Sequence, residues 1–215
     1  MKKVFLIIFC LSIFSESVQA QIKKFAGPKF GVTMVQAGSL ASILREDVDM
    51  FSGDIRKEWN GSTGKYGSFM FQYGWQWESR FSDGGNVTGI VEWVALVGGM
   101  ERGMFLPSLS SMVGIRSDKG VEFVVGPNLS IGGLSMEIGA GYNFTFGKLN
   151  VPVSILYVPS FNRIYSHDAE YEWVNEYDEN GDLYNQYERE ISPDYTVTHP
   201  TGARVSVMVG FNLSK

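Results

Sequence analysis

The chain of 215 residues has a single cysteine, Cys10, which lies inside an apolar run over residues 4–14. A lipoprotein cysteine would end such a run, because it becomes the new lipidated N-terminus, whereas residues 11–14 continue the run beyond Cys10. We therefore expect Cys10 to be removed with a leader. The mature chain would then have no disulfide and no thiolate chemistry.

The N-terminal segment has the three parts of a secretory leader. Lys2 and Lys3 precede the apolar run, and residues 15–20 form a short polar stretch with Val18 and Ala20 near its end. This pattern predicts a signal peptide over residues 1–20, cleaved near Ala20 and too short to anchor the chain in a membrane. The remaining residues, 21–215, are expected to form one domain.

Long apolar runs and positive charge are also scarce after the leader. No later segment has the ~18 consecutive apolar residues of a transmembrane helix. Loss of Lys2, Lys3 and Glu16 takes the formal net charge from −5 to −6, which argues against nucleic acid as a partner. The two histidines, His167 and His199, have no matching nucleophile, so the sequence predicts no enzymatic role, no cofactor and no metal site.

Alternation of apolar and polar residues is abundant instead. In residues 66–81, Phe69, Phe71, Tyr73, Trp75 and Trp77 share one parity and mostly polar residues share the other. Successive strand side chains point to opposite faces, so this segment predicts a long strand with one aromatic face. The same alternation recurs in residues 29–34, 91–97, 106–116, 122–131, 136–146, 151–157 and 203–213. Most of these strands have about the length that a tilted strand needs to cross a bilayer, which predicts an all-β fold, an eight-stranded antiparallel up-and-down transmembrane β-barrel.

Charged residues within the predicted strands fall on the polar parity, which would face the barrel lumen. They are Lys29, Glu78, Glu92, Arg116, Glu122, Glu137 and Arg204. A Lys or Arg on the lipid-facing parity would cost roughly 2–4 kcal/mol at the bilayer midplane, and buried charges need partners. The sequence thus predicts a structural network of charges in the lumen, drawn from Glu92, Glu122, Glu137, Arg116 and Arg204. The alternative is that this parity is the solvated outer face of a soluble sheet.

The connections between the predicted strands alternate in length. If the seven connections are numbered along the chain, the short turns at 82–85, 117–120 and 147–149 are the second, fourth and sixth. The two long connections, at about 38–64 and 161–200, are the first and the seventh. Outer-membrane barrels keep short turns on the periplasmic side and longer loops outside, so we expect two long extracellular loops. Residues 41–59 of the first loop are expected to contain a short helix, with Ser39 as its N-cap.

The second long loop is acidic and aromatic. Residues 165–195 contain ten acids, seven aromatic residues and one arginine, Arg189. Asn180-Gly181 is a strong turn signal, which predicts a projecting hairpin with strands at 169–177 and 183–191. Gly181 is fourth from Asp178, whereas a calcium-binding loop needs glycine at the sixth position, so a solvated turn is the expected structure. Divalent ions bridging this loop to lipopolysaccharide phosphates remain an alternative. The residues expected to contact an extracellular partner are Tyr171, Trp173, Tyr177, Asp178, Asp182, Tyr184 and Tyr187.

With these features the chain resembles the small outer-membrane β-barrel proteins of the porin-like superfamily. It also resembles uncharacterised secreted proteins of similar size that carry EFVVGPNLS, here residues 122–130, and GKLNVPV, here residues 147–153. It departs from such barrels in ending on Lys215 rather than on an aromatic residue, for which Phe211 is the nearest substitute.

The resemblance implies an outer-membrane location, contact with outer-membrane lipid and lipopolysaccharide, and a structural or surface-interaction role with an unidentified partner. Three alternatives stay open: a narrow channel, a lipid-modifying enzyme that uses His167 or His199, and a soluble periplasmic barrel that binds an apolar ligand.

Overall fold

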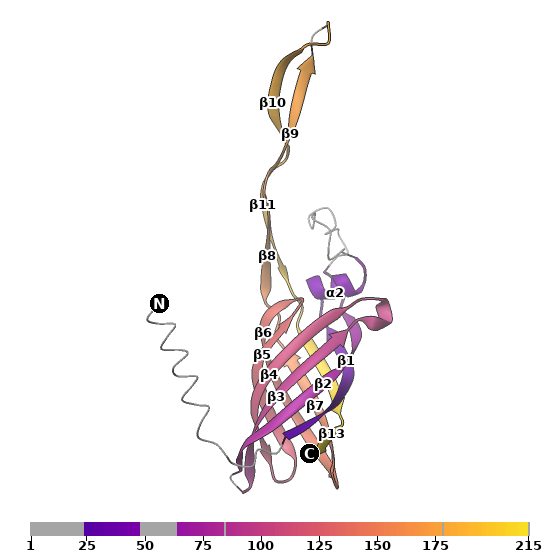
Figure 1. Cartoon of the computed structure of the whole chain (residues 1–215), viewed down its shortest axis with the longest axis vertical. Helices are drawn as coiled ribbons and strands as arrows, with labels where there is room; N and C mark the ends of the chain where they lie inside the picture. Colours follow the sequence, from indigo (N-terminus) through magenta and orange to yellow (C-terminus); the bar gives the residue numbers. More distant parts are fainter. Residues whose placement is uncertain (1–23, 48–63, 84, 178, 215) are drawn as a thin grey trace, which may run out of the picture.

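The chain folds into a closed barrel of eight antiparallel strands, from which a long hairpin projects (Figure 1). The computed structural model describes residues 24–47, 64–83, 85–177 and 179–214. The predicted leader and most of the predicted 41–59 helix lie outside these residues. The barrel strands are β1 (Lys24–Val35), β2 (Ser68–Asp83), β3 (Val87–Gly98), β4 (Leu106–Ser117), β5 (Val121–Ser130), β6 (Gly133–Phe146), β7 (Leu149–Val158), and a last strand in two parts, β12 (Arg204–Gly210) and β13 (Asn212–Ser214).

Each strand pairs with its neighbours in sequence, and the last strand pairs with both β7 and β1, which closes the barrel. This confirms the predicted eight-stranded antiparallel barrel. Following paired residues from Lys24 round all the strands leads back to β1 at Met34, ten residues further along, a stagger that requires strongly tilted strands. An eight-stranded barrel has an interior just wide enough for its own side chains.

The last strand is split at Phe211 for a chemical reason. The Phe211 N–H donates to the carbonyl oxygen of Pro28 on β1 at 2.9 Å. Proline has no N–H with which to return the bond, so the ladder loses one rung at this point. The pairs on either side, Lys29 with Gly210 and Ala26 with Leu213, keep one register, so β12 and β13 form a single interrupted strand.

The two ends of the barrel differ. Three short connections close one end, whereas the other carries α2 (Ser39–Leu44), the 3-10 helix η1 (Met100–Arg102) and the hairpin (Figure 1). Leu40, Ala41 and Leu44 of α2 are buried, and they form a core cluster with Val35, Met70 and Leu106 of the strands. The short helix is therefore a lid on the long-loop end. None of the helices in the described ranges is long and apolar enough to cross a membrane.

The prediction that Ser39 caps this helix was wrong. Gly38 is the N-cap, no side chain caps the helix, and Ser39 is its first, buried residue. The cause is crowding at the barrel rim, because a Cβ on Gly38 would lie 2.5 Å from the backbone nitrogen of Gly202. The other end of α2 is held by Arg102, whose Nη1 donates to the carbonyl oxygen of Leu44 at 2.8 Å.

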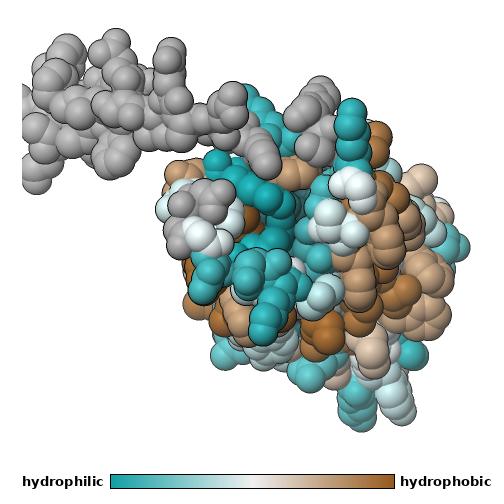
Figure 2. Space-filling view, turned by 90° about the horizontal axis from the view of Figure 1, so that it is seen from below, coloured by the Kyte–Doolittle hydropathy of each residue, from teal (hydrophilic) through white to brown (hydrophobic). Residues whose placement is uncertain are grey.

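Side chains alternate between the lumen and the outside along every barrel strand. On β2, for example, Phe71, Tyr73 and Trp75 are exposed while Gln72 and Gln76 are buried. All seven charged residues of the predicted lumen parity are buried, none more than 8% exposed. Seen from the end with the short turns, hydrophobic side chains line the flank of the barrel and hydrophilic ones gather at its end (Figure 2).

The projecting hairpin contains two small two-stranded sheets. The one nearer the barrel pairs β8 (Asn162–His167) with β11 (Tyr195–Pro200), and the outer one pairs β9 (Glu170–Tyr177) with β10 (Leu183–Ser192). The strands expected at 169–177 and 183–191 thus form within one residue of their predicted bounds. At the tip, Gly181 has a φ of 86°, a left-handed conformation that favours glycine.

Candidate functional site

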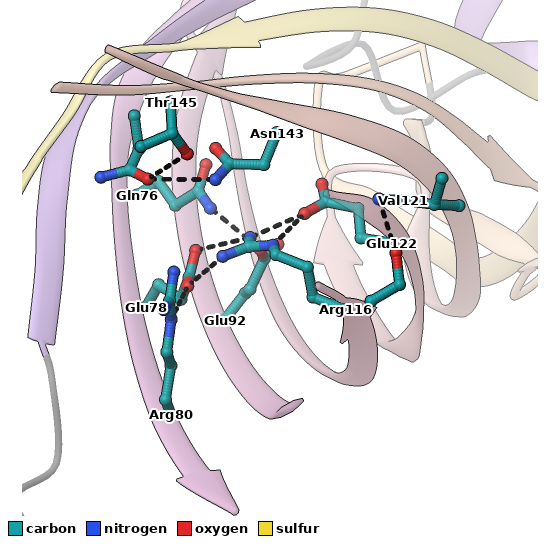
Figure 3. A network of polar contacts seen from close by, with 11 residues as sticks. Gln76, Glu78, Arg80, Glu92, Arg116, Val121, Glu122, Asn143 and Thr145 are labelled. Atoms are coloured by element: carbon teal, nitrogen blue, oxygen red, sulfur yellow. Dashed lines mark hydrogen bonds and ion pairs between the residues drawn. The ribbon is translucent and has the colours of Figure 1, made fainter. Parts of the chain in front are cut away.

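The first candidate site is the polar interior at the short-turn end of the barrel (Figure 3). Arg116 of β4 donates two hydrogen bonds to the Glu78 carboxylate of β2, at 2.6 and 2.8 Å. It also donates to Oε2 of Glu122 on β5, from Nε at 2.9 Å and from Nη2 at 2.6 Å. One buried guanidinium therefore joins three strands, in the forked geometry that arginine makes with carboxylates.

Two further residues extend this cluster. Oε1 of Glu92 on β3 lies 3.7 Å from Nη2 of Arg116 and accepts a hydrogen bond from Nε2 of Gln76 at 3.0 Å. At the mouth of the barrel, Nε of Arg80 lies 3.5 Å from Oε1 of Glu78. Beside it, a cavity of about 430 Å³ opens at the short-turn end, lined in part by Arg80, Lys119 and Asn143.

A second polar cluster lies nearer the long-loop end. Oε2 of Glu137 accepts a hydrogen bond from Oγ of Ser110 at 2.5 Å. Asn128 bridges the cluster, because its Nδ2 donates to Oγ of Ser110 at 2.9 Å and its Oδ1 accepts from Nη2 of Arg204 at 3.0 Å. Arg204 also donates to Oγ of Ser130 at 2.9 Å. No ion pair joins these residues to Arg116 within the described part of the chain.

An apolar layer separates the two clusters. On β4, Met112 lies between Ser110 and Arg116, and on β5, Val124 lies between Glu122 and Asn128. Together with Leu156, Met208 and residues of β3, these side chains form a buried hydrophobic cluster across the lumen. The one network expected from the sequence is therefore two: Glu92, Glu122 and Arg116 come together, while Glu137 and Arg204 lie apart from them.

Sequence reasoning left out the residues that complete each cluster. Glu78 has the same inward parity as the predicted members and lies 2.6 Å from Arg116, as close as Glu122 does. Asn128 and Ser110 are uncharged, so a search for charges on the lumen parity passes over them. The alternation itself carried the missing signal, since each of the three residues is buried and has at least one exposed apolar neighbour in the sequence.

The second candidate site is the outer sheet of the hairpin. Tyr171, Trp173, Tyr177, Tyr184 and Tyr187 are all exposed there. Asp182 is exposed near the tip, and the side chain of Asp178 lies outside the described residues. The expected contact residues other than Asp178 therefore occur together on the two strands and the turn that joins them.

Near the tip of this sheet, the Glu176 carboxylate accepts hydrogen bonds from two side chains. The Tyr184 hydroxyl and the Asn185 side-chain amide both donate to Oε2 of Glu176, each at 3.0 Å. These bonds, the one from Asn185 foremost, hold the pKa of Glu176 below its ordinary value, and the same contact raises the pKa of Tyr184. The arrangement orders the turn but offers no catalytic pair.

Hydrogen bonds of the Thr201 side chain connect the two ends of the hairpin at the barrel rim. The Thr201 hydroxyl donates to the carbonyl oxygen of Phe161 and accepts from the Phe161 N–H, each at 3.1 Å. The next residue, Gly202, has a φ of 86°, and a Cβ there would lie 2.4 Å from the carbonyl oxygen of Gln36. The hairpin therefore leaves the barrel through a tightly packed joint.

A metal site or a catalytic histidine needs a defined geometry of neighbouring side chains. Among the described residues, no group of three or more His, Cys, Asp or Glu side chains is arranged to hold a metal ion. His199 lies on β11, where partial burial lowers the pKa of its imidazole, and the side chain of His167 lies outside the described residues.

Neither a protein-family model nor a curated protein sequence matches this chain.

Proposed function

We propose that this chain is a bacterial outer-membrane β-barrel, related to the small porin-like barrels, that anchors a projecting hairpin at the cell surface in a structural or surface-interaction role. The observation that carries this proposal is the distribution of polar and apolar side chains between the inside and the outside of the barrel. Its charged side chains face the interior, and its large apolar side chains face outward. A water-soluble barrel would have the opposite arrangement.

The outward apolar surface is continuous from strand to strand. Exposed large apolar side chains occur on each of the eight strands, and they include Phe30, Tyr73, Trp93, Ile115, Phe123, Ile138, Ile155 and Val207. Burying one such side chain is worth about 1.5–3 kcal/mol, so leaving all of them in water would be very unfavourable. Apolar patches larger than a few hundred Å² mark membrane or protein contact.

The asymmetry of the two ends supports an orientation. Outer-membrane barrels turn their short connections to the periplasm and their long loops to the outside. In that orientation α2 and the hairpin are extracellular, and the chain reaches β1 from the periplasmic side, as a secreted chain cleaved near Ala20 would. The outward apolar surface of the barrel would then contact outer-membrane lipid, and the long-loop end would contact lipopolysaccharide.

A channel is disfavoured by the filled interior. The apolar layer of Met112, Val124 and their neighbours crosses the lumen between the two polar clusters, and α2 covers the long-loop end. The cavity beside Asn128 and Glu137 measures about 20 Å³, room for about one water molecule. The lumen is therefore closed to the passage of solutes.

A soluble carrier of apolar ligands is disfavoured by the same interior. Such a carrier needs an apolar cavity with few polar groups. Here the cavity open at the short-turn end is lined by Arg80, Arg116, Asp118 and Lys119 among others. The polar lining fits structural ion pairing better than the capture of a lipid.

The decisive experiment separates inner and outer membranes of cells that express the full chain and compares gel mobility before and after boiling. We expect the protein in the outer-membrane fraction, with faster migration when unboiled, because an intact barrel resists detergent. Protease added to intact cells should cut within the hairpin and leave the barrel whole. Recovery as a soluble periplasmic protein with no mobility shift would overturn the proposal.

A further inference from the structure

The outer sheet of the hairpin has two chemically different faces. In an antiparallel pair, residues directly opposite each other point to the same side. Trp173 pairs with Glu188 and Tyr171 with Glu190, so these four residues form one surface, the aromatic–acid face. The opposite face carries Val174 with Tyr187 and Glu172 with Arg189.

The carboxylates of the two faces differ in what they already bind. On the opposite face, Arg189 donates to Oε1 of Glu172, so that charge is compensated. On the aromatic–acid face, the side chains of Glu188 and Glu190 form no hydrogen bond or ion pair within the described residues. The rings beside them are open to solvent, Trp173 at 62% and Tyr171 at 56% exposure. This face therefore presents two carboxylates and two rings without partners.

An exposed ring next to a carboxylate is a receptor for a basic side chain. An arginine or lysine is attracted to the face of an aromatic ring and pairs with a carboxylate through charge-assisted hydrogen bonds. Arginine suits both at once, because its guanidinium is planar and forked. Trp173 with Glu188, and Tyr171 with Glu190, form two such units on the same face.

The spacing of the two units defines the ligand. They are two residues apart along β9, or roughly 6.5 Å at the rise of a strand. Alternate side chains of an extended peptide have the same separation and point to the same side. We propose that the aromatic–acid face binds an extended polypeptide segment that carries arginine or lysine at alternate positions. The biological setting of this contact rests on the proposed surface location of the hairpin.

Charge complementarity selects this occupant over the others available. The segment 165–195 has ten acids and one arginine, so the hairpin of a second copy would be repelled. An anionic lipid surface would be repelled for the same reason. A basic polypeptide, by contrast, neutralises Glu188 and Glu190 and covers Trp173 and Tyr171. It would also support a two-stranded sheet, which is only marginally stable alone in water.

The test measures peptide binding to the purified full-length protein in non-ionic detergent by calorimetry. The probe is a synthetic peptide in which three arginines alternate with threonines, and the control peptide has the same composition with its arginines contiguous. We expect the alternating peptide to bind more tightly. Trp173→Ala and Glu188→Gln should each raise its Kd about tenfold.

Two matched variants guard against unspecific charge attraction. Val174→Ala removes most of an apolar side chain from the opposite face, and Glu179→Gln removes a carboxylate near the tip. Both should leave the Kd within about twofold. Equal affinity for the two peptides, or an effect of Val174→Ala as large as that of Trp173→Ala, would overturn the inference.

The location of the protein is measured separately, so the outer-membrane proposal and the peptide-binding proposal are tested independently. A purified protein that binds the alternating peptide but fractionates as soluble would sink the outer-membrane proposal and keep the binding face. An outer-membrane barrel whose hairpin ignores the alternating arrangement would do the reverse.

Discussion

The barrel and the hairpin differ in where their charged side chains lie. In the barrel, Arg116 and its three glutamate neighbours are almost completely buried and are in contact with one another. In the hairpin, carboxylates and rings lie in the open on a sheet of two strands with nothing packed over them. The difference teaches that polar residues can hold a structure together where they are enclosed, whereas exposed ones are free to recognise something else. The same substitution should therefore have very different effects in the two regions.

The largest effect is expected from Arg116→Met. It leaves Glu122 buried without a cation and Glu78 with Arg80 alone, which costs about 3–5 kcal/mol of the free energy of unfolding. The matched change in the hairpin, Arg189→Met, breaks an exposed pair with Glu172 and should cost less than about 1 kcal/mol. Urea unfolding in detergent, followed by tryptophan fluorescence, measures both. Equal effects would remove the distinction between the two regions.

A smaller effect should follow from a charge on the outer surface. Ile155 of the barrel and Ile191 of the hairpin are similarly exposed, at 57% and 52%. In lipid vesicles, Ile155→Arg should destabilise the barrel by about 2–4 kcal/mol if its outer face meets lipid, whereas Ile191→Arg stays in water and should change little. Unfolding in vesicles gives the comparison. An Ile155→Arg barrel as stable as the parent would count against the membrane proposal.

The joint between the two regions offers a weaker perturbation. Thr201→Val keeps the shape of the side chain but removes its hydrogen bonds with Phe161, a loss of about 1–3 kcal/mol at the rim. We expect faster hydrogen exchange at the base of the hairpin with little change in the unfolding of the barrel. Thr198→Val, at an exposed position on β11, serves as the control. A uniform loss of protection throughout the barrel would show that the joint belongs to the barrel core.

The smallest effect concerns acidity at the hairpin tip. Hydrogen bonds from Asn185 and Tyr184 lower the pKa of Glu176 in the folded hairpin. The stabilisation is therefore complete above the pKa of the unfolded chain and is lost as the pH falls through the lower, folded value. Below about pH 4.5 the side-chain amide resonances of Asn185 should shift as the tip loosens. Glu176→Gln has no carboxylate to protonate and should abolish this pH dependence. A titration unchanged by Glu176→Gln would contradict the assignment.

Alternation in the sequence was enough to predict the barrel, because a strand places every second residue on one face. It was also enough to predict which charges are buried. It could not predict which charges meet, since parity gives the face of a residue but not its height in the barrel. Met112 and Val124 share the lumen parity with Arg116 and Glu122, yet only the register of the strands shows that they form a separating layer.

The misplaced helix cap has a similar origin. Ser39 has the right chemistry for an N-cap, but the start of α2 is decided by the approach of Gly38 to Gly202, which lies far away in sequence. The split at Phe211 likewise depends on Pro28 across the sheet. Local patterns predict elements well, and contacts between distant segments decide their ends.

The pairing of β1 with β12 and β13 also bears on how the barrel assembles. From β1 to β7, each strand pairs with the strand that follows it in the sequence, and β7 pairs with the last strand across the hairpin. The pairing of β1 with the last strand joins the two most distant segments of the barrel, as Lys29 and Gly210 illustrate. Bringing such distant segments together has the highest entropic cost of loop closure, so this pairing should form last. It is also the pairing from which Pro28 withholds a hydrogen bond. The closing edge is thus the weakest line of the cylinder, the place where it would open first when the chain is pulled or heated.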